Sequence, residues 1–385
     1  MLGVECYGGG LWHTWLDRDL GISGRVLVRA KADDGKEIVV QKFVKVNKPI
    51  ARVSSLCIHL QTADERGALK LNKETHLAPI LGTAGILIDG VKKQLTGGEG
   101  EAEDEDFWKC KQEPLILELI AKELNIEVKV IADFELNLFD TQPACLGGIK
   151  DEFVYSARLD NQATCFVSIE SLIAHTNSEI FENDVDISMV CLFDHEEVGS
   201  QSSHGAGSPV ISEAVRRIST ALSNNPGTLD PDLYSASLRK SFLFSVDQAH
   251  ALHPNFPSKH EKNHAPLMNK GVVMKTNQNQ RYTTNSVTGF VVRELVRKAG
   301  VTPVQEFVVR NDCPCGSTIG PIIAANTGIR AVDAGMPQLS MHSCREVMGI
   351  VDCKFCTSTD SNIWRSLNIC FTHSLRFSLN SDQRK

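Results

Sequence analysis

The stretch 152–175, EFVYSARLDNQATCFVSIESLIAH, decides the fold class of this chain. Its first part, 152–158, is rich in aromatic and β-branched residues and predicts a strand, whereas 161–175 has the apolar spacing of a helix. The pair is repeated further on: ISMVCLFD (187–194) predicts a strand and SPVISEAVRRISTALS (208–223) predicts a helix. Strands that alternate with helices are typical of an α/β sheet that is covered by helices.

The alternation continues toward the C-terminus. Further strands are predicted at 242–246, 271–275, 306–310 and 329–335, and further helices at 285–300 and 318–328. We therefore expect an α/β domain with a helix-covered, mostly parallel sheet. The last residues, 347–385, are rich in Ser, Cys and Asn without a clear period, and we expect them to form an atypical, irregular tail.

The part before residue 140 has a different pattern. Residues 24–46 contain two β-branched runs around Asp33-Asp34-Gly35, which predicts a hairpin. The acidic, glycine-rich segment 97–113 predicts a solvated loop, with binding of a basic partner as the alternative. Pro114 then opens the amphipathic run LILELIAKELNI, which predicts a helix with proline in its first turn. We expect a separate, β-rich domain here.

Bulk composition excludes several classes of protein. The chain has 385 residues, of which 42% are hydrophobic, and a net charge of −7. This charge argues against a nucleic-acid partner, and no apolar run is long enough to span a membrane. The 12 cysteines are scattered, which favours a reducing compartment and hence the cytoplasm, with the vacuole as the alternative.

Polar residues follow several of the predicted strands. Asp160 comes after the first strand, Glu196 and Glu197 after the second, Asp247 after 242–246, and His342 after the last strand. Ligands of open α/β sheets bind beyond the carboxyl ends of the strands, so these side chains are expected at one edge.

Carboxylates and an imidazole are suitable ligands for zinc. Two zinc ions need a bridging carboxylate, and one further carboxylate must accept the proton of the attacking water. In the pair Glu196-Glu197, one glutamate suits the role of general base and the other suits the role of zinc ligand. The alternatives are a helix cap for Asp160 and solvated loop residues for the two glutamates.

A second group of candidates lies between residues 250 and 282. The segment HALHPNFPSKHEKNH contains four histidines, which fit no standard zinc spacing and are surface residues in the alternative interpretation. Lys275 follows, and near a metal site a lysine is able to neutralise an acidic substrate side chain, although a plain surface lysine is the alternative.

Eight segments, spread over residues 3–346, together resemble the aspartyl aminopeptidase family. Their sequences resemble those of its plant members most. They are ECYGGGLWHTWLDRDL, DTQPACLGG, EFVYSARLDN, LFDHEEVGS, HALHPNFPSKHEKNH, NQRYTTN, RNDCPCGSTIGPI and QLSMHSCRE. The resemblance implies a zinc-dependent aminopeptidase that removes N-terminal Asp or Glu from peptides. It also implies two zinc ions per subunit and a homo-oligomer, a dodecamer in the family.

The resemblance also implies a domain organisation. Residues 1–140 correspond to a β-rich dimerisation domain inserted into the catalytic domain, residues 141–346 to the second part of the zinc peptidase catalytic domain, and residues 347–385 to a tail that departs from the family.

Roles for individual residues follow from the same resemblance. Glu196 corresponds to the general base. The zinc ligands correspond to Asp160, which bridges the two ions, and to Glu197, Asp247 and His342. The substrate-binding residues correspond to His59, His250, Lys275 and Tyr282, with His59 reaching the active site of a neighbouring subunit.

The beginning of the chain differs from the family. Members carry a longer N-terminal part that ends in a His-x-Asp strand, and its histidine binds the same zinc as Asp247. We therefore expect a chain truncated at its N-terminus in which one of the two zinc sites lacks its histidine. The alternative to an active aminopeptidase is a non-catalytic subunit that acts through the dimerisation domain.

Overall fold

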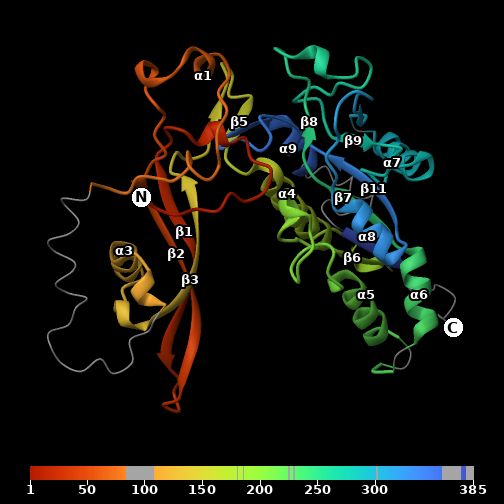
Figure 1. The fold of residues 1–385 in the computed structure, drawn as a ribbon. Helices are drawn as coiled ribbons and strands as arrows, with labels where there is room; N and C mark the ends of the chain where they lie inside the picture. The colour runs from red at the N-terminus through yellow and green to blue at the C-terminus, as the bar shows by residue number, and fades with distance from the viewer. Residues whose placement is uncertain are drawn as a thin grey trace. The chain divides into compact units, whose positions relative to one another are not determined.

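The chain folds into two compact units in the computed structural model (Figure 1). The first unit comprises Met1–Cys6 and Leu11–Pro143, and the second comprises Tyr7–Gly10 and Ala144–Lys385. The structure describes residues 1–83, 108–179, 181–184, 186–223, 226–228, 230–300, 302–357 and 374–378. Among them, no helix has both the length and the apolar character that crossing a membrane requires. The predicted domain boundary at 140/141 lies close to the division at 143/144, while the dimerisation role of the first unit stays a prediction.

A twisted antiparallel sheet forms the centre of the first unit. Strand β1 (Leu20–Lys31) lies between β2 (Glu37–Ala51) and β3 (Ile131–Asp140). The predicted hairpin is confirmed: β1 and β2 are joined by a tight turn in which Gly35 has a φ of +82°. Glycine takes this left-handed conformation without a steric penalty, which is why the turn forms at Gly35.

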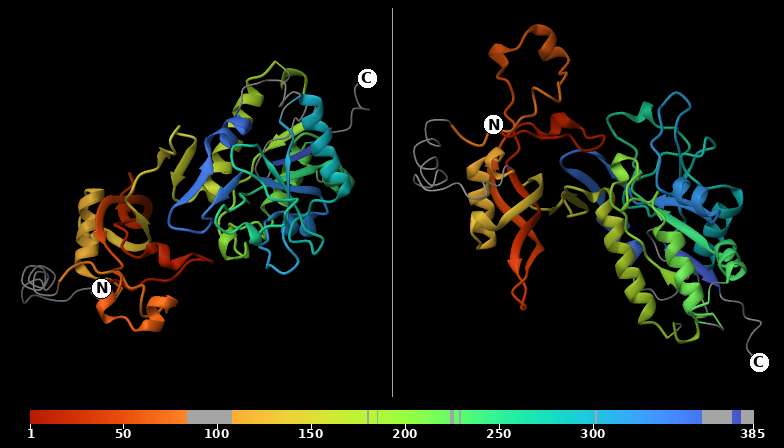
Figure 2. Two further views of the ribbon diagram at one scale, coloured as in Figure 1. Left: turned by 90° about the horizontal axis from the view of Figure 1, so that it is seen from above. Right: turned by 60° about the horizontal axis from the view of Figure 1, so that its bottom comes forward.

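Helix α3 (Pro114–Leu124) covers one face of this sheet, as Figures 1 and 2 show. The prediction of a helix with proline in its first turn is confirmed. The buried residues of α3 and of the sheet form one cluster, which contains Ile22, Val26, Val28, Val44, Val46, Ile116, Leu117, Ile120, Ala121 and Ile131. The short segments of this unit are η1 (Trp12–Trp15), η2 (Ile58–Leu60), α1 (Ala63–Gly67), η3 (Lys109–Lys111) and η4 (Val128–Val130). Most of the predicted acidic loop 97–113 lies outside the described residues.

The second unit contains a main sheet with the strand order β10-β9-β11-β7-β14-β6. Its strands are β6 (Asp186–Met189), β7 (Phe242–Val246), β9 (Val273–Thr276), β10 (Gln305–Val308), β11 (Arg330–Gly335) and β14 (Ser374–Ser378). A smaller sheet has the order β4-β5-β13-β12-β8. Its strands are β4 (Cys145–Gly147), β5 (Phe153–Ser156), β8 (Ala249–His250), β12 (Pro337–Leu339) and β13 (Glu346–Gly349).

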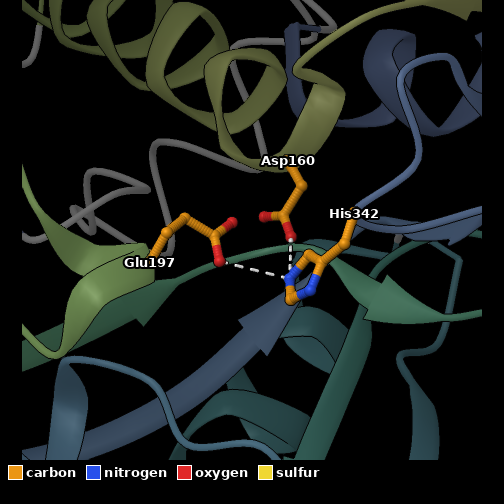
Figure 3. A group of neighbouring side chains, drawn as sticks. All are labelled: Asp160, Glu197 and His342. Carbon is orange, nitrogen blue, oxygen red and sulfur yellow. Dashed lines mark ion pairs between the residues drawn. The ribbon is translucent and has the colours of Figure 1, made fainter. Parts of the chain in front are cut away.

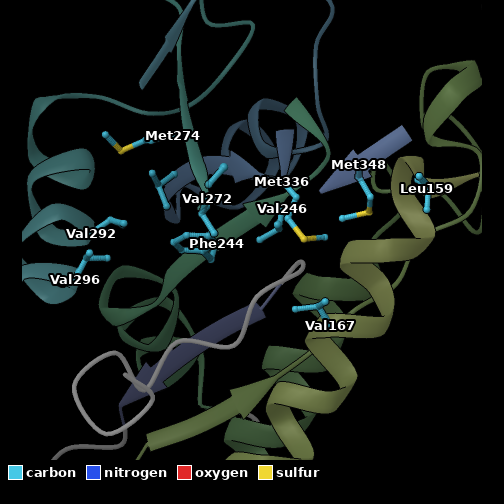
Figure 4. Close-up of a cluster of buried hydrophobic side chains, with 12 residues drawn as sticks. Leu159, Val167, Phe244, Val246, Val272, Met274, Val292, Val296, Met336 and Met348 are labelled. Atoms are coloured by element: carbon cyan, nitrogen blue, oxygen red, sulfur yellow. The ribbon is translucent and has the colours of Figure 1, made fainter. Parts of the chain in front are cut away.

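Helices pack on both faces of the main sheet, because neighbouring side chains of β7 enter different cores. Phe244 belongs to a cluster with residues of α4 (Leu159–Thr176) and α7 (Ser286–Ala299), which Figure 4 shows. Leu243 belongs to a second cluster, with residues of α5 (Val210–Ala221), α6 (Pro231–Lys240) and α8 (Gly320–Thr327). Successive side chains of a strand point to opposite faces, so a central strand that is apolar on both faces is covered twice.

The predicted α/β class is therefore confirmed, but the main sheet is mixed. Pairs β10–β9 and β11–β7 are parallel, as the sequence predicts, whereas β11–β9 is antiparallel. Strand β14 is also antiparallel to both of its neighbours, β7 and β6. The alternation of strands and helices in the sequence does not reveal that the sheet is mixed. Strand β14 comes from the last residues of the chain, where the sequence predicts an irregular tail.

Residues 347–357 and 374–378 depart from the irregular tail that the sequence predicts. Strand β13 pairs with β5 and β12, and α9 (Ile350–Thr357) follows it directly. Met348 and Asp352 are completely buried. Pairing with distant strands stabilises this segment, although its sequence has no clear period. Residues 358–373 and 379–385 lie outside the described residues.

The predicted strand 187–194 is shorter in the structure, where β6 ends at Met189. The chain then leaves the sheet and forms the single turn η6 (Glu196–Val198). This turn carries the two adjacent glutamates that the sequence singles out. The other short turns of the second unit are η5 (Phe181–Asn183) and η7 (Pro257–Lys259).

Candidate metal centre

Three of the predicted ligands come together from distant parts of the chain (Figure 3). Asp160 lies in the first turn of α4, just after β5. Glu197 lies on η6, and His342 follows β12. Their ligand atoms all lie within 4.8 Å of one another, which makes them a group able to hold a metal ion.

The spacing of these atoms suits a single ion. His342 Nε2 lies 3.2 Å from Glu197 Oε2 and 3.6 Å from Asp160 Oδ2. Two ligands of one tetrahedral zinc ion stand about 3.4 Å apart when each bond is about 2.1 Å long. One imidazole and two carboxylates also form a donor set that zinc accepts, with a position left for water. The residues present therefore fit zinc.

The turn that carries Glu197 is flanked in the sequence by two residues whose backbones are in the left-handed conformation. His195 before it has a φ of +61°, and Gly199 after it has a φ of +100°. The side chain of His195 is held by Ser202, whose Oγ lies 2.7 Å from His195 Nδ1. The contact with Ser202 fixes the residue directly before the turn that carries Glu197.

Asp247 continues β7, and its carboxylate lies close enough to Asp160 to raise the pKa of Asp160 by charge repulsion. The backbone at Asp247 is in very close contact with Gly335, where a Cβ atom would come within 1.6 Å of Asp247 O. Only glycine fits at that point of β11. The position of Asp247 therefore depends on the absence of a side chain at residue 335.

Carboxylates accumulate at this edge of the sheet. Burial raises the pKa of Asp160 well above its usual value, and Asp247, Glu197 and Glu346 raise it further by charge repulsion. The pKa of Glu197 is raised by burial, although His342 opposes this shift. A buried group of like charges is unfavourable unless a cation or protons neutralise it, so the electrostatics agree with a cation site.

Glu196 belongs to the same electrostatic group. Burial raises the pKa of its carboxyl, Asp247 and Glu197 raise it further, and Lys275 lowers it. A carboxyl group with a raised pKa is suited to accept a proton near neutral pH.

Lys275 lies next to Asp247 and is almost completely buried. Its Nζ donates to the carbonyl oxygens of Asp247 and Gln248, at 3.0 Å each, and lies 3.7 Å from Asp247 Oδ2. It also lies 5.1 Å from the centre of the Tyr282 ring. Lys275 therefore is not the plain surface lysine of the alternative interpretation, and its ammonium group supports the strand end that carries Asp247.

The other predicted substrate residues lie in two places. Tyr282 and His250 both contact Phe307, with ring centres at 6.5 Å and 5.5 Å from the Phe307 ring. His59 is an exposed residue of η2 in the first unit. Substrate binding by these residues stays a prediction.

The remaining histidines of the 250–264 segment are engaged with their neighbours. His253 donates its backbone N–H to His260 Nε2 at 3.0 Å, and His264 pairs with Glu261. Among the described residues, the His, Cys, Asp and Glu side chains that lie close enough together to hold a metal ion are those of Asp160, Glu197 and His342.

Two contributors to the site are not predicted from the sequence, Glu346 and the glycine-rich segment Tyr7–Gly10. Glu346 accepts backbone hydrogen bonds from Asp160 and His342, at 3.0 Å and 2.9 Å. Gly9 O lies 3.2 Å from His342 Nδ1, so the imidazole donates to this carbonyl when Nε2 is free for a metal. The only sequence signals are a charged residue at the start of an apolar run and the motif YGGG.

The chain matches a known family along most of its length. The family model described as "Aminopeptidase I zinc metalloprotease (M18)" matches residues 1–359. The chain belongs to this M18 family of metallo-aminopeptidases. The resemblance drawn from the sequence motifs is therefore confirmed, and zinc is the metal of the family.

Relatives and solved structures agree with this assignment. The "Probable aspartyl aminopeptidase" of Ricinus communis is 46% identical over 370 residues, which cover 92% of this chain and 73% of that protein. The "Aspartyl aminopeptidase" of Aspergillus oryzae is 44% identical, over 91% of this chain and 72% of that protein. The chain thus spans about three quarters of the length of these relatives.

Among solved structures, a chain of the "Cryo-EM structure of the Ape4 and Nbr1 complex" is similar with a TM-score of 0.80 and 39% identity. The match covers 95% of this chain and 66% of that one. A chain of the "S. cerevesiae mApe1 dodecamer" has a TM-score of 0.70 and 29% identity, over 93% of this chain and 72% of that one.

Proposed function

We propose that this chain is a zinc-dependent aminopeptidase that removes N-terminal Asp or Glu from peptides. The observation that carries this proposal is the convergence of Asp160, Glu197 and His342 at the spacing that one zinc ion requires. The family membership supports the reaction class, and the names of the relatives support the acidic substrate.

Asp160, Glu197 and His342 would hold one zinc ion, and Asp160 and Asp247 would contribute to a second one. Bound zinc supplies a Lewis acid that polarises the scissile carbonyl and makes water more acidic. The charge repulsion by which Asp247 raises the pKa of Asp160 supports the sharing of Asp160, since it requires the two carboxyl groups to lie close together.

Glu196 serves as the general base. It accepts the proton of the attacking water and transfers it to the amine that leaves. Burial and the neighbouring Asp247 and Glu197 raise the pKa of Glu196, which makes its carboxylate a stronger base than an exposed glutamate.

Lys275, Tyr282 and His250 are proposed to bind the acidic side chain of the substrate, together with His59 from a neighbouring subunit. Lys275 supplies the positive charge next to the metal ligands, 3.7 Å from Asp247. The contribution of His59 requires a homo-oligomer, which the similarity to a dodecameric aminopeptidase supports.

The test compares Glu196→Gln with Asp194→Asn in the purified chain, assayed with zinc and a peptide that begins with Asp. Asp194 lies on the same loop, and its side chain is 71% exposed, so it is a matched control. We expect Glu196→Gln to lose at least about 100-fold in kcat and Asp194→Asn to keep it. Equal activity of the two variants would contradict the assigned base.

A further inference from the structure

Glu346 is a buried carboxylate directly behind the proposed zinc ligands. It is the first residue of β13, its exposed fraction is 2%, and its backbone pairs with Ser156 of β5. A charged side chain in such a place is costly unless several donors hold it. What binds this carboxylate therefore indicates its role.

The two oxygens of Glu346 accept hydrogen bonds from two different segments. Oε2 accepts the backbone N–H of Asp160 at 3.0 Å. Oε1 accepts the backbone N–H of His342 at 2.9 Å and the side-chain amide of Gln338 at 3.4 Å. One carboxylate thus connects the start of α4 with the loop after β12, and both of these segments carry a ligand.

We infer that Glu346 is a positioning residue of the zinc site, because its carboxylate holds the backbones of Asp160 and His342 at the separation that the metal needs. This inference rests on the proposed zinc site. The hydrogen bonds of Glu346 to Asp160 and His342 run to the backbone N–H groups of these residues. Glu346 acts through the backbone of the two residues whose side-chain atoms lie 3.6 Å apart.

A carboxylate suits this task better than an amide would. Both of its oxygens accept, so both N–H groups are satisfied at once, whereas glutamine would turn its NH2 group toward one of them. Its negative charge also adds to the field of Asp160 and Glu197, which attracts a divalent cation to this edge of the sheet.

The experiment measures the dissociation constant of zinc by competition with a chelator, in the complete chain and without substrate. Removing a partner that orients a metal ligand costs about 10–100-fold in metal affinity, and we expect Glu346→Gln to fall in this range. Glu197→Ala, which removes a proposed ligand, should weaken binding at least as much.

Asp352→Asn is the matched control for a purely structural effect. Asp352 is another fully buried carboxylate that accepts backbone N–H groups, from Asn269 and Gly271, but these groups carry no proposed ligand. The Asp352→Asn variant should have a lower thermal stability than the unaltered chain and the same zinc affinity. If Glu346→Gln also leaves the zinc affinity unchanged, the inference is wrong, while a loss in Glu197→Ala would still uphold the proposed site.

Gln338→Leu is a second variant in case Glu346→Gln does not fold. It keeps the carboxylate but removes the amide that donates to Glu346 Oε1. We expect a smaller, measurable loss of zinc affinity, and an unchanged affinity would overturn the inference. If the unaltered chain binds no zinc, the proposed function and the inference both fail.

Discussion

His342 Nε2 lies 3.2 Å from Glu197 Oε2, although one residue follows a strand of the small sheet and the other lies on a turn beyond the main sheet. Neither side chain is fully buried, since each is 37% exposed. An ion pair with this exposure contributes little to stability by itself. The geometry is therefore better explained by a metal ion that both side chains bind than by a need to stabilise the fold.

The first prediction concerns this pair. His342→Ala removes one of three ligand atoms and should lower the zinc affinity by at least about 100-fold, as expected when a metal ligand rather than an orienting partner is lost. The measurement is zinc content after dialysis against a weak chelator. His204→Ala, an exposed histidine of the loop after Glu197, is the control and should retain zinc. Equal zinc contents in the two variants would exclude His342 as a ligand.

The second prediction concerns pH. The pKa values of Asp160, Glu196 and Glu197 are raised in the folded protein, mainly by burial. The folded zinc-free chain therefore binds protons more tightly than the unfolded chain, and these groups add stability as the pH falls toward about 4. Zinc must displace these protons. The gain in melting temperature on adding zinc should hence grow from about pH 5 to about pH 8, and a gain that shrinks over this range would contradict the account.

The third prediction concerns Asp352 on α9. Burial raises the pKa of Asp352 to about 6, so its contribution to folding stability rises as the pH falls through about 6 toward about 4. Asp352→Asn should remove this dependence and cost about 1–2 kcal/mol near neutral pH, because one backbone N–H loses its acceptor. Urea unfolding at several pH values measures both effects. A variant with the slope and stability of the unaltered chain would show that α9 is not held by Asp352.

The fourth prediction concerns Gly335. A Cβ atom there would lie 1.6 Å from Asp247 O, so Gly335→Ala must displace one of the two strands. We expect a loss of about 1–3 kcal/mol in the free energy of unfolding, together with weaker zinc binding through Asp247. Gly316→Ala is the control, because nothing lies within 4 Å of a Cβ at residue 316. Thermal unfolding measures the stability of both variants, and equal melting temperatures would contradict this close approach.

Much of the fold follows from local patterns. The β-branched runs around Gly35 and the amphipathic run after Pro114 predict their elements correctly, because turn chemistry and helical spacing are encoded over a few residues. The rule that ligands bind beyond the carboxyl ends of strands also leads to the expectation that Asp160, Glu197 and His342 come together, and their ligand atoms do lie within 4.8 Å of one another.

Other features depend on contacts between distant residues. The segment 347–357 has no clear period, yet it packs because β13 pairs with β5 and β12. The role of Glu346 is invisible in the sequence because its partners are backbone N–H groups, which nearly every residue offers. Likewise, no pattern shows that the ammonium group of Lys275 is bound to two carbonyl oxygens.

The most direct test of the central claim is the zinc dependence of peptide hydrolysis. The purified chain is freed of metal with a chelator, assayed for release of Asp from a peptide, and assayed again after zinc is returned. The account predicts that activity disappears and then returns in the unaltered chain, and that zinc restores nothing in His342→Ala. Hydrolysis that persists without metal, or that zinc restores equally in both proteins, would contradict it.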